Sequence, residues 1–172
     1  DAATVFLLTD GNGLWISRDR GDQWSAVADG ARAFDPQSNV LALAVAPDDP
    51  QEWYVAAFQQ NRGRVFVTVD GGATFREIYL TPVERFGVFD VYYDRARRAV
   101  IIATGQGGLL ESSDRGLTWR VVRWFADGLV RLIVNPANPS VRYVATSRGS
   151  LFRTLDGGRM WTEASAWFDT FS

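Results

Sequence analysis

The side chains that could do chemistry in this sequence are carboxylates, tyrosines and arginines. The chain of 172 residues holds no His and no Cys, and all 18 of its basic residues are Arg. It therefore lacks an imidazole base or metal ligand, a thiolate, and a lysine for a Schiff base. Carboxylate pairs, or a tyrosine nucleophile with arginines around an acidic substrate, are typical of glycosidases. Glycosidases are the one enzyme class that the composition leaves open.

Arginines and aromatic residues are the other candidates for a functional surface. Arg suits protein interfaces, because its guanidinium group can bind a carboxylate through two hydrogen bonds. Three arginines lie in the turn after Asp94, and Arg120 follows nearby in the sequence. The candidate partner-binding residues are Arg95, Arg97, Arg98, Arg123, Arg131 and Trp124. A solvated turn without a partner is the alternative interpretation, since surface charges contribute little by themselves.

Charge and hydropathy narrow the class of protein further. The net charge is −2 and the pI is about 5.1, so no global positive field attracts nucleic acid. No apolar run approaches the roughly 18 residues that cross a bilayer. The opening Asp-Ala-Ala-Thr is neither an initiator Met nor a basic leader, which indicates a processed, trimmed or excised chain.

Four segments of the chain repeat one another, and we call them the repeat turns. All fit Ser/Thr-x-Asp-x-Gly-x-x-aromatic, and their aspartates lie 51, 44 and 42 residues apart. Their shared positions are Asp19, Gly21 and Trp24; Asp70, Gly72 and Phe75; Asp114, Gly116 and Trp119; and Asp156, Gly158 and Trp161. This period suits a four-stranded antiparallel sheet with its turns.

Each repeat turn has a physical explanation as the turn of a β-hairpin. The Asp carboxylate can accept backbone N–H groups, and the Gly can take a positive φ. The aromatic residue opens the outgoing strand and can pack against the neighbouring sheet. We therefore predict structural roles for these residues. Calcium binding is the rival, but the alternating acids and closing Glu of an EF-hand loop are missing, and we predict no metal and no cofactor.

The runs around the repeat turns predict an all-β fold, a β-propeller of about four four-stranded blades in a single domain. The predicted first strands are residues 40–45, 88–92 and 129–134. The second strands are residues 5–9, 53–57, 100–104 and 142–146, and the third strands are residues 13–16, 64–67, 108–111 and 150–153. Pro47 to Pro50 and Pro136 to Pro139 end strand pairing in two copies. The blades span about 4–30, 39–80, 87–124 and 128–167, and the next strand starts at 168–172.

The chain begins at a second strand, which leaves about fifteen strands, one short of four full blades. An open blade would expose a sheet edge, and proteins usually close, cover or pair such edges. Three resolutions are open at this point: the tail from Trp167 to Ser172 closes a four-bladed ring, the chain is part of a larger propeller, or two copies meet.

The four repeat turns resemble the Asp box, or bacterial neuraminidase repeat. Propellers with this box include sialidases, the sortilin luminal domain, xyloglucan-degrading glycosidases and the photosystem II assembly factor family, and the style is most similar to the assembly-factor and sortilin types. Gln23 and Met160 stand where the family prefers Thr, and Phe75 replaces Trp. The resemblance implies a peripheral, structural box and a secreted, periplasmic or luminal location.

Three functions remain open. A non-catalytic scaffold or assembly propeller that binds a protein partner, or another copy of the chain, is the leading hypothesis. A glycosidase or sialidase is the second, although the Phe-Arg-Ile-Pro signature is absent, none of the five glutamates can be assigned to a channel-facing strand, and Asp90 with Arg131 is more readily a structural ion pair. A glycan-binding module is the third, with Trp124–Phe125 and Trp167–Phe168 as stacking faces.

Overall fold

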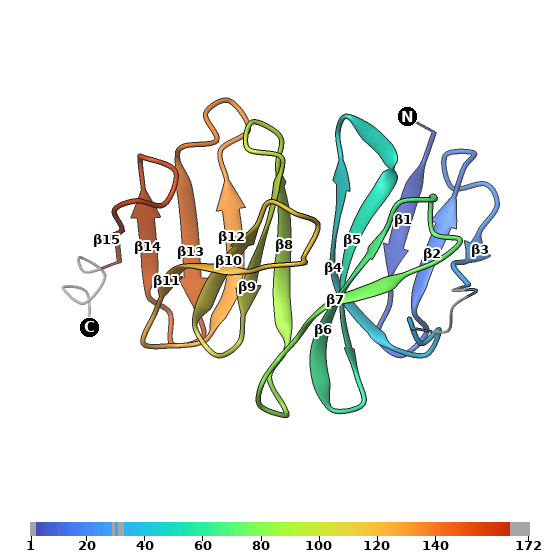
Figure 1. Cartoon of the computed structure of the whole chain (residues 1–172), viewed down its shortest axis with the longest axis horizontal. Coiled ribbons are helices and arrows are strands. Elements are labelled where there is room, and N and C mark those ends of the chain that lie inside the picture. The colour runs from blue at the N-terminus through green and yellow to red at the C-terminus, as the bar shows by residue number, and fades with distance from the viewer. Residues whose placement is uncertain (1–2, 29, 31–32, 166–172) are drawn as a thin grey trace.

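The structure, a computed structural model, describes residues 3–28, 30 and 33–165 as four antiparallel sheets that follow the chain in order (Figure 1). The first sheet holds β1 (Val5–Leu8), β2 (Leu14–Ser17) and β3 (Ser25–Ala26); the second β4 (Asn39–Ala46), β5 (Asp49–Gln59), β6 (Arg62–Thr68) and β7 (Arg76–Leu80); the third β8 (Val88–Asp94), β9 (Ala99–Thr104), β10 (Gly108–Ser112) and β11 (Arg120–Trp124); the fourth β12 (Leu129–Val134), β13 (Arg142–Thr146), β14 (Leu151–Thr154) and β15 (Thr162–Glu163). No helix of these residues is long and apolar enough to cross a membrane.

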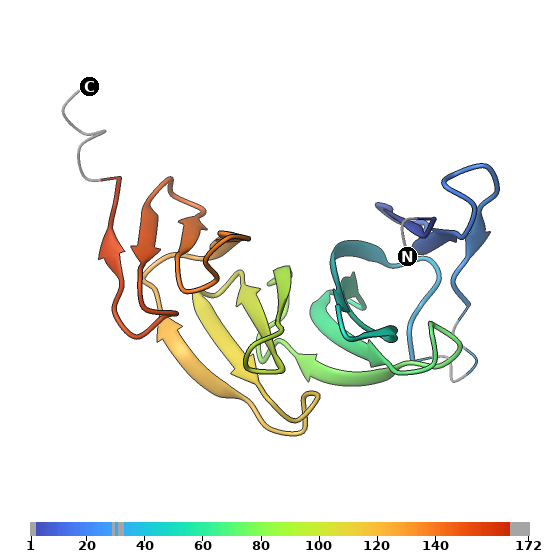
Figure 2. The same ribbon diagram turned by 90° about the horizontal axis from the view of Figure 1, so that it is seen from above.

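The sheets are arranged around an arc. Figure 2 shows the outermost strands β7 and β11 on its convex side. Because each sheet pairs its strands in sequence order, the first strands β4, β8 and β12 lie at the opposite, concave side. The strands predicted from the repeats are confirmed, with boundaries that move by up to four residues. The tail from Trp167, where the next strand and one ring-closing alternative were predicted, lies outside the described residues.

Side chains packed between successive sheets form the core. Strand β9 is buried along its whole length, because its two faces are covered by different neighbours. Val100 and Ile102 pack toward the second sheet, whereas Ile101 and Ala103 pack toward the fourth. Full burial of an aliphatic side chain of this size contributes about 1.5–3 kcal/mol. The continuous apolar run of β9 is therefore explained by burial on both faces.

The hairpin between β4 and β5 corrects one prediction. Pro50 was expected to end the pairing, but it lies inside β5, and Ala46 still pairs with Asp49. The register then shifts, so that Val45 pairs with Trp53. A bulge tolerates the missing N–H of proline where a regular ladder does not.

A bulge also interrupts each of the three first strands near its beginning. The residues left out of the pairing are Leu41 in β4, Phe89 in β8 and Val130 in β12. The bulge changes which side chains share a face. In β8 the buried positions become Val88, Val91 and Asp94 instead of every second residue. Burial in β8 therefore does not alternate from one residue to the next.

The repeat turns share one hydrogen-bond pattern. The Ser or Thr hydroxyl accepts the N–H of the Gly at 2.8–3.0 Å and donates to the Asp Oδ1 at 2.7–2.8 Å. The same Oδ1 accepts the N–H four residues later at 2.9 Å in each turn. These bonds satisfy backbone donors that a tight turn would otherwise leave unpaired.

A threonine hydroxyl adds a further bond in the second and third repeat turns. Thr74 and Thr118 donate to the Oδ2 of Asp70 and Asp114 at 2.6 Å. This bond is the largest of several that lower the pKa of Asp70 and of Asp114 to about 2. In the first and fourth turns, where Gln23 and Met160 stand, the backbone N–H is the main cause of the lowered pKa.

We predict that Thr118→Val raises the pKa of Asp114 and leaves that of Asp70 unchanged, as measured by NMR titration of the carboxyl carbons. The folded pKa lies below the unfolded value of about 3.9, so the stabilisation is present above that pH. It is lost as the pH falls toward about 2, and the variant should lose it at a higher pH. An unchanged pKa of Asp114 in the variant would contradict this assignment of the cause.

The aromatic residue of each repeat turn packs according to the neighbour available to it. Trp119 Nε1 donates to the carbonyl of Ile78 in the second sheet at 2.8 Å. The rings of Phe75 and Trp161 pack on Phe34 and Phe125, which precede their own sheets in the chain. Trp24 belongs to the first sheet and is 39% exposed. The aromatic residue thus contributes most where a preceding sheet is present.

Candidate functional site

The arginine turn predicted as a partner site lies between β8 and β9, and its three side chains have different surroundings. Arg95 forms an ion pair with Asp48, in the turn between β4 and β5, at 2.7 Å. Arg97 forms one with Glu111 of β10 at 3.2 Å. Arg98 is exposed and has a left-handed backbone with φ 50°. The three residues therefore do not act as one patch.

The remaining predicted partner residues are spread over the molecule. Arg123 and Trp124 lie in β11, on the convex side, where the Arg123 guanidinium carbon is 5.6 Å from the ring centroid of Phe125. Trp124 is 56% exposed. Arg131 lies in β12, on the concave side. The predicted set is thus divided between opposite sides of the arc.

Asp90 and Arg131 face each other on the concave side, as the sequence suggested. Arg131 Nε lies 3.6 Å from Asp90 Oδ2, which also accepts the backbone N–H of Leu132 at 2.9 Å. Burial raises the pKa of Asp90, while the hydrogen bond from Leu132 and the charge of Arg131 oppose this shift. The carboxylate therefore connects β8 to β12 across the boundary between two sheets.

A second carboxylate for acid–base chemistry is missing from the described first strands. Asp94 is the only other acid in β4, β8 and β12, and it is buried against Arg142. The five glutamates all lie outside these strands, as expected, and they are Glu52, Glu77, Glu84, Glu111 and Glu163. The described residues also hold no group of three or more acids that could bind a metal ion. Asp90 and Arg131 therefore have the geometry of a structural ion pair, and Asp90 lacks the second carboxylate of a catalytic dyad.

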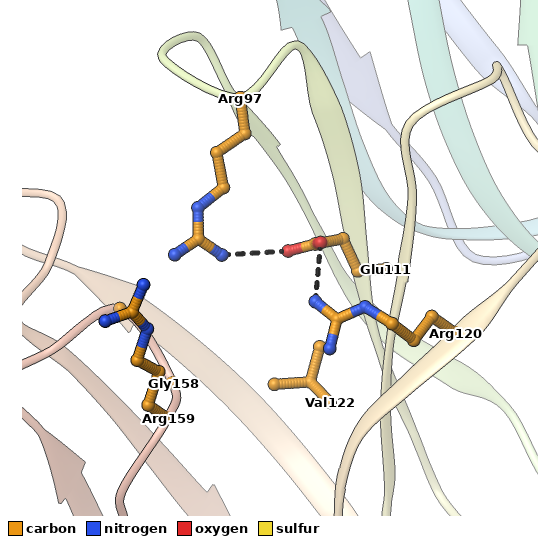
Figure 3. A pocket seen from close by; sticks show the side chains of 7 residues that line it. Arg97, Glu111, Arg120, Val122, Gly158 and Arg159 are labelled. Atoms are coloured by element: carbon orange, nitrogen blue, oxygen red, sulfur yellow. Dashed lines mark hydrogen bonds and ion pairs between the residues drawn. The ribbon is translucent and has the colours of Figure 1, made fainter.

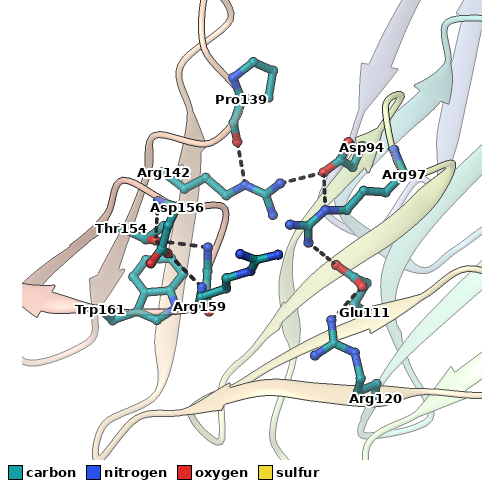
Figure 4. Close-up of polar contacts among 11 residues, drawn as sticks. Asp94, Arg97, Glu111, Arg120, Pro139, Arg142, Thr154, Asp156, Arg159 and Trp161 are labelled. Atoms are coloured by element: carbon teal, nitrogen blue, oxygen red, sulfur yellow. Dashed lines mark hydrogen bonds and ion pairs between the residues drawn. The ribbon is translucent and has the colours of Figure 1, made fainter.

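A chain of alternating charges connects the third and fourth sheets (Figure 4). Asp94 binds Arg142 through Oδ2 at 2.5 Å and lies 3.9 Å from Arg97 Nε. Glu111 in turn pairs with Arg97 at 3.2 Å and with Arg120 at 2.8 Å. Each carboxylate therefore lies between two guanidinium groups, and these contacts fix the orientation of the arginine side chains.

Next to these alternating charges lies a groove of about 600 Å³, which we call the arginine groove (Figure 3). Its walls come from the third sheet and from the fourth repeat turn, and the residues lining it are Arg97, Glu111, Arg120, Val122, Gly157, Gly158 and Arg159. Of these, Arg97 belonged to the predicted partner residues, and Arg120 was noted as an arginine near them in the sequence. Glu111 was a usable signal, because Ile16 and Val67 occupy the equivalent position in the first two copies.

Two curated relatives match the chain by sequence, and both are fungal xyloglucanases. A probable oligoxyloglucan-reducing end-specific xyloglucanase of Neosartorya fischeri is 31% identical over 139 residues, which cover 70% of this chain and 17% of the relative. An oligoxyloglucan-reducing end-specific xyloglucanase of Emericella nidulans is 26% identical over 91% of this chain and 22% of the relative. The chain thus spans about a fifth of these relatives' length. No protein-family model matches it.

Solved structures share the fold at low sequence identity. The GH74 enzyme of Niastella koreensis superposes with a TM-score of 0.75 and 19% identity, over 95% of this chain and 28% of that one. YCF48 bound to a D1 peptide superposes with a TM-score of 0.54 and 13% identity, over 95% of this chain and 79% of that one. A nidogen/laminin complex superposes with a TM-score of 0.69 and 12% identity, over 93% of this chain and 60% of that one.

These neighbours confirm the predicted fold class, a segment of a β-propeller of about four blades. Both sequence relatives are named as xyloglucanases, which belong to the glycosidase class that the sequence left open.

Proposed function

We propose that this chain is a segment of an Asp-box β-propeller that binds a protein partner and does not itself carry a catalytic centre. The proposal takes each sheet as one blade, with bounds of about 4–30, 39–80, 87–124 and 128–167. It takes the repeat turns as Asp boxes, and it places the protein outside the cytoplasm. The shared hydrogen-bond pattern of the four turns supports the Asp-box assignment.

The observation that carries the proposal is the single accessible carboxylate of the first strands β4, β8 and β12. Glycosidases use two carboxyl groups about 5–9.5 Å apart. Asp90 has no such companion in β4, β8 or β12, because Asp94 is 3% exposed and bound to Arg142. Asp90 itself is engaged by Arg131 and the N–H of Leu132. A rigid surface of turns and strand edges is what remains for function.

A glycosidase-related role is the second candidate. Both sequence relatives are xyloglucanases, and burial raises the pKa of Asp90, a change that general acids require. In this case Asp90 would act as the acid of a site completed elsewhere in a longer protein. The two candidates differ in whether Asp90 is needed for any turnover.

We expect the purified chain to select a common motif from a displayed library of random peptides and to leave xyloglucan oligosaccharides intact. The rigid sheets keep the ordering cost of binding low, which favours measurable affinity for an extended peptide. Binding of the selected peptides is measured by calorimetry, and hydrolysis is measured as new reducing ends.

Asp90→Asn provides the matched control, since it keeps the shape of the side chain and removes its acid. The binding proposal expects peptide affinity within about twofold of the unmodified chain. Turnover of xyloglucan oligosaccharides that disappears in Asp90→Asn would instead establish the second candidate. A selection that enriches no motif at all would overturn the protein-binding proposal.

A further inference from the structure

The arginine groove exists because the fourth repeat turn departs from the third. At the boundary between the second and third sheets, Arg115 fills the corresponding space and pairs with Glu52 at 2.6 Å. Arg76 closes it further by donating to the Arg115 carbonyl at 2.8 Å. At the next boundary Gly157 takes the place of Arg115, and Arg120 takes the place of Arg76. The space therefore stays open, with arginines around it.

Two of the three guanidinium groups at the groove, those of Arg97 and Arg120, are held in place by a neighbour. Arg97 pairs with Glu111 and lies so close to Gly157 that a Cβ atom there would be 2.8 Å from its Nη2. Arg120 is held by the other oxygen of Glu111. The backbone N–H of Arg159 donates to Asp156 at 2.9 Å, which fixes the base of that side chain. Such preorganisation reduces the entropy lost when a ligand binds.

Positive charge is in excess at this site. The alternating charges comprise three arginines and two carboxylates. Arg159 adds one positive charge and Asp156 of the same turn adds one negative charge, so one positive charge remains in excess. Arg159 makes no salt bridge within the part of the chain that the structure describes, and the side chain of Arg120 is 64% exposed. Figure 3 shows Arg159 across the open space from Glu111 and Arg120, with Arg97 above them. An anionic group entering the groove would meet unpaired guanidinium donors.

We propose that the arginine groove binds a carboxylate group from an acidic, extended segment of a protein partner. Glu111 shows the geometry required, because each of its oxygens binds one guanidinium group. A second carboxylate would take the remaining donors of Arg120 together with those of Arg159. This inference rests on the proposed protein-binding function and names the chemistry of the partner.

The strand beside the groove favours a peptide over other carriers of a carboxylate. Arg120 and Val122 belong to β11, which is the outermost strand of its sheet and pairs only with β10 among the described strands. An extended peptide can add to such an edge through its main chain and place alternate side chains into an adjoining groove. Exposed Val121 and Met160, next in sequence to Arg120 and Arg159, offer apolar contacts.

The probe is a fluorescent peptide of alternating glutamate and threonine, compared with its glutamine counterpart, and fluorescence anisotropy measures the affinity. We expect the glutamate peptide to bind at least tenfold more tightly. Arg120→Gln/Arg159→Gln should reduce its affinity at least tenfold. The control Arg18→Gln/Arg148→Gln removes the same charge at exposed sites away from the groove and should change the affinity less than about twofold.

Gly157→Arg separates a groove from a general charge effect. Arg115 occupies the equivalent position with φ 57°, so the fold accommodates arginine in this left-handed conformation, which has φ 73° at Gly157. The added side chain should fill the groove and abolish peptide binding despite its positive charge. Tighter binding of the glutamate peptide to this variant would overturn the proposal. Thermal unfolding of every variant confirms that it is folded.

Other outcomes are equally decisive. Binding of an oligogalacturonate probe, with none of the glutamate peptide, would assign the groove to a sugar acid and overturn the peptide proposal. A library selection that yields non-acidic peptides insensitive to the groove variants would overturn the groove but leave the protein-binding function standing. Failure of both the probe and the selection would overturn both.

Discussion

Replacing Asp94 by leucine is expected to lower the free energy of unfolding by about 3–5 kcal/mol, the cost of leaving a buried arginine without its partner. Both side chains of the Asp94–Arg142 pair are 3% exposed, and the two charged atoms lie 2.5 Å apart. Arg142 Nε is held by the carbonyl of Pro139 at 2.8 Å, so the guanidinium group cannot reach water without losing this bond. Arg142→Met should cost a similar amount. Chemical denaturation measures both losses.

The double variant Asp94→Leu/Arg142→Met tests the reason for this loss. A buried ion pair replaced by apolar side chains of similar volume is often neutral, so we expect stability within about 2 kcal/mol of the unmodified chain. Arg95→Met is the control, since it breaks the exposed pair with Asp48 and should cost less than about 1 kcal/mol. A double variant as unstable as either single variant would show that the hydrogen bonds of the turn, rather than the charges, hold the sheets together.

The fold was predictable because its signal repeats. One copy of the turn motif is compatible with many folds. Four copies, spaced by about the chain length of one four-stranded sheet, are compatible with few. The strands followed from the alignment of the copies, since each second strand is a run of β-forming residues. In β9 this run is covered on both faces, whereas β1 of the first sheet stays partly exposed. The bulges at Leu41, Phe89 and Val130 did not follow. A bulge depends on how a first strand fits between its neighbours, and sequence alternation contains no record of that fit.

The arginine groove was only partly predictable, and the reason is geometric. The turn after Asp94 was correctly noted for its arginines, but adjacent side chains of a tight turn point in different directions. Arg97 therefore meets Glu111 of its own sheet and the turn of the next sheet, while Arg95 meets Asp48 of the sheet before. Comparing the repeat turns position by position would have given part of the signal, although the second turn also has a glycine, Gly71, at this position. Gly157 in place of Arg115 marks an opening, and Glu111 marks a polar wall.

Among the four glycines shared by the repeat turns, Gly116 has the closest contact and should be the most costly to replace. Gly116→Ala is expected to cost about 2–5 kcal/mol, from a left-handed backbone at about 1–2 kcal/mol and overpacking at about 1–3 kcal/mol. Gly116 has φ 80°, and a Cβ atom there would lie 2.4 Å from Cβ of Ile78. Ile78 belongs to β7 of the preceding sheet and is buried in the core between the two sheets. The clash cannot be relieved by a rotamer change, because it involves the first atom of the Ile78 side chain.

Gly149→Ala isolates the backbone contribution to this cost. Gly149 has φ 91°, yet a Cβ atom there would meet nothing within 4 Å. Its replacement should cost only the left-handed strain of about 1–2 kcal/mol. The difference between the two variants in chemical denaturation then measures the packing of the third repeat turn against the second sheet. If both variants lost equal stability, the contact between Gly116 and Ile78 would be unimportant, and the repeat turn would stabilise only its own hairpin. A larger loss for Gly116→Ala would mean that this turn also sets how closely two successive sheets approach.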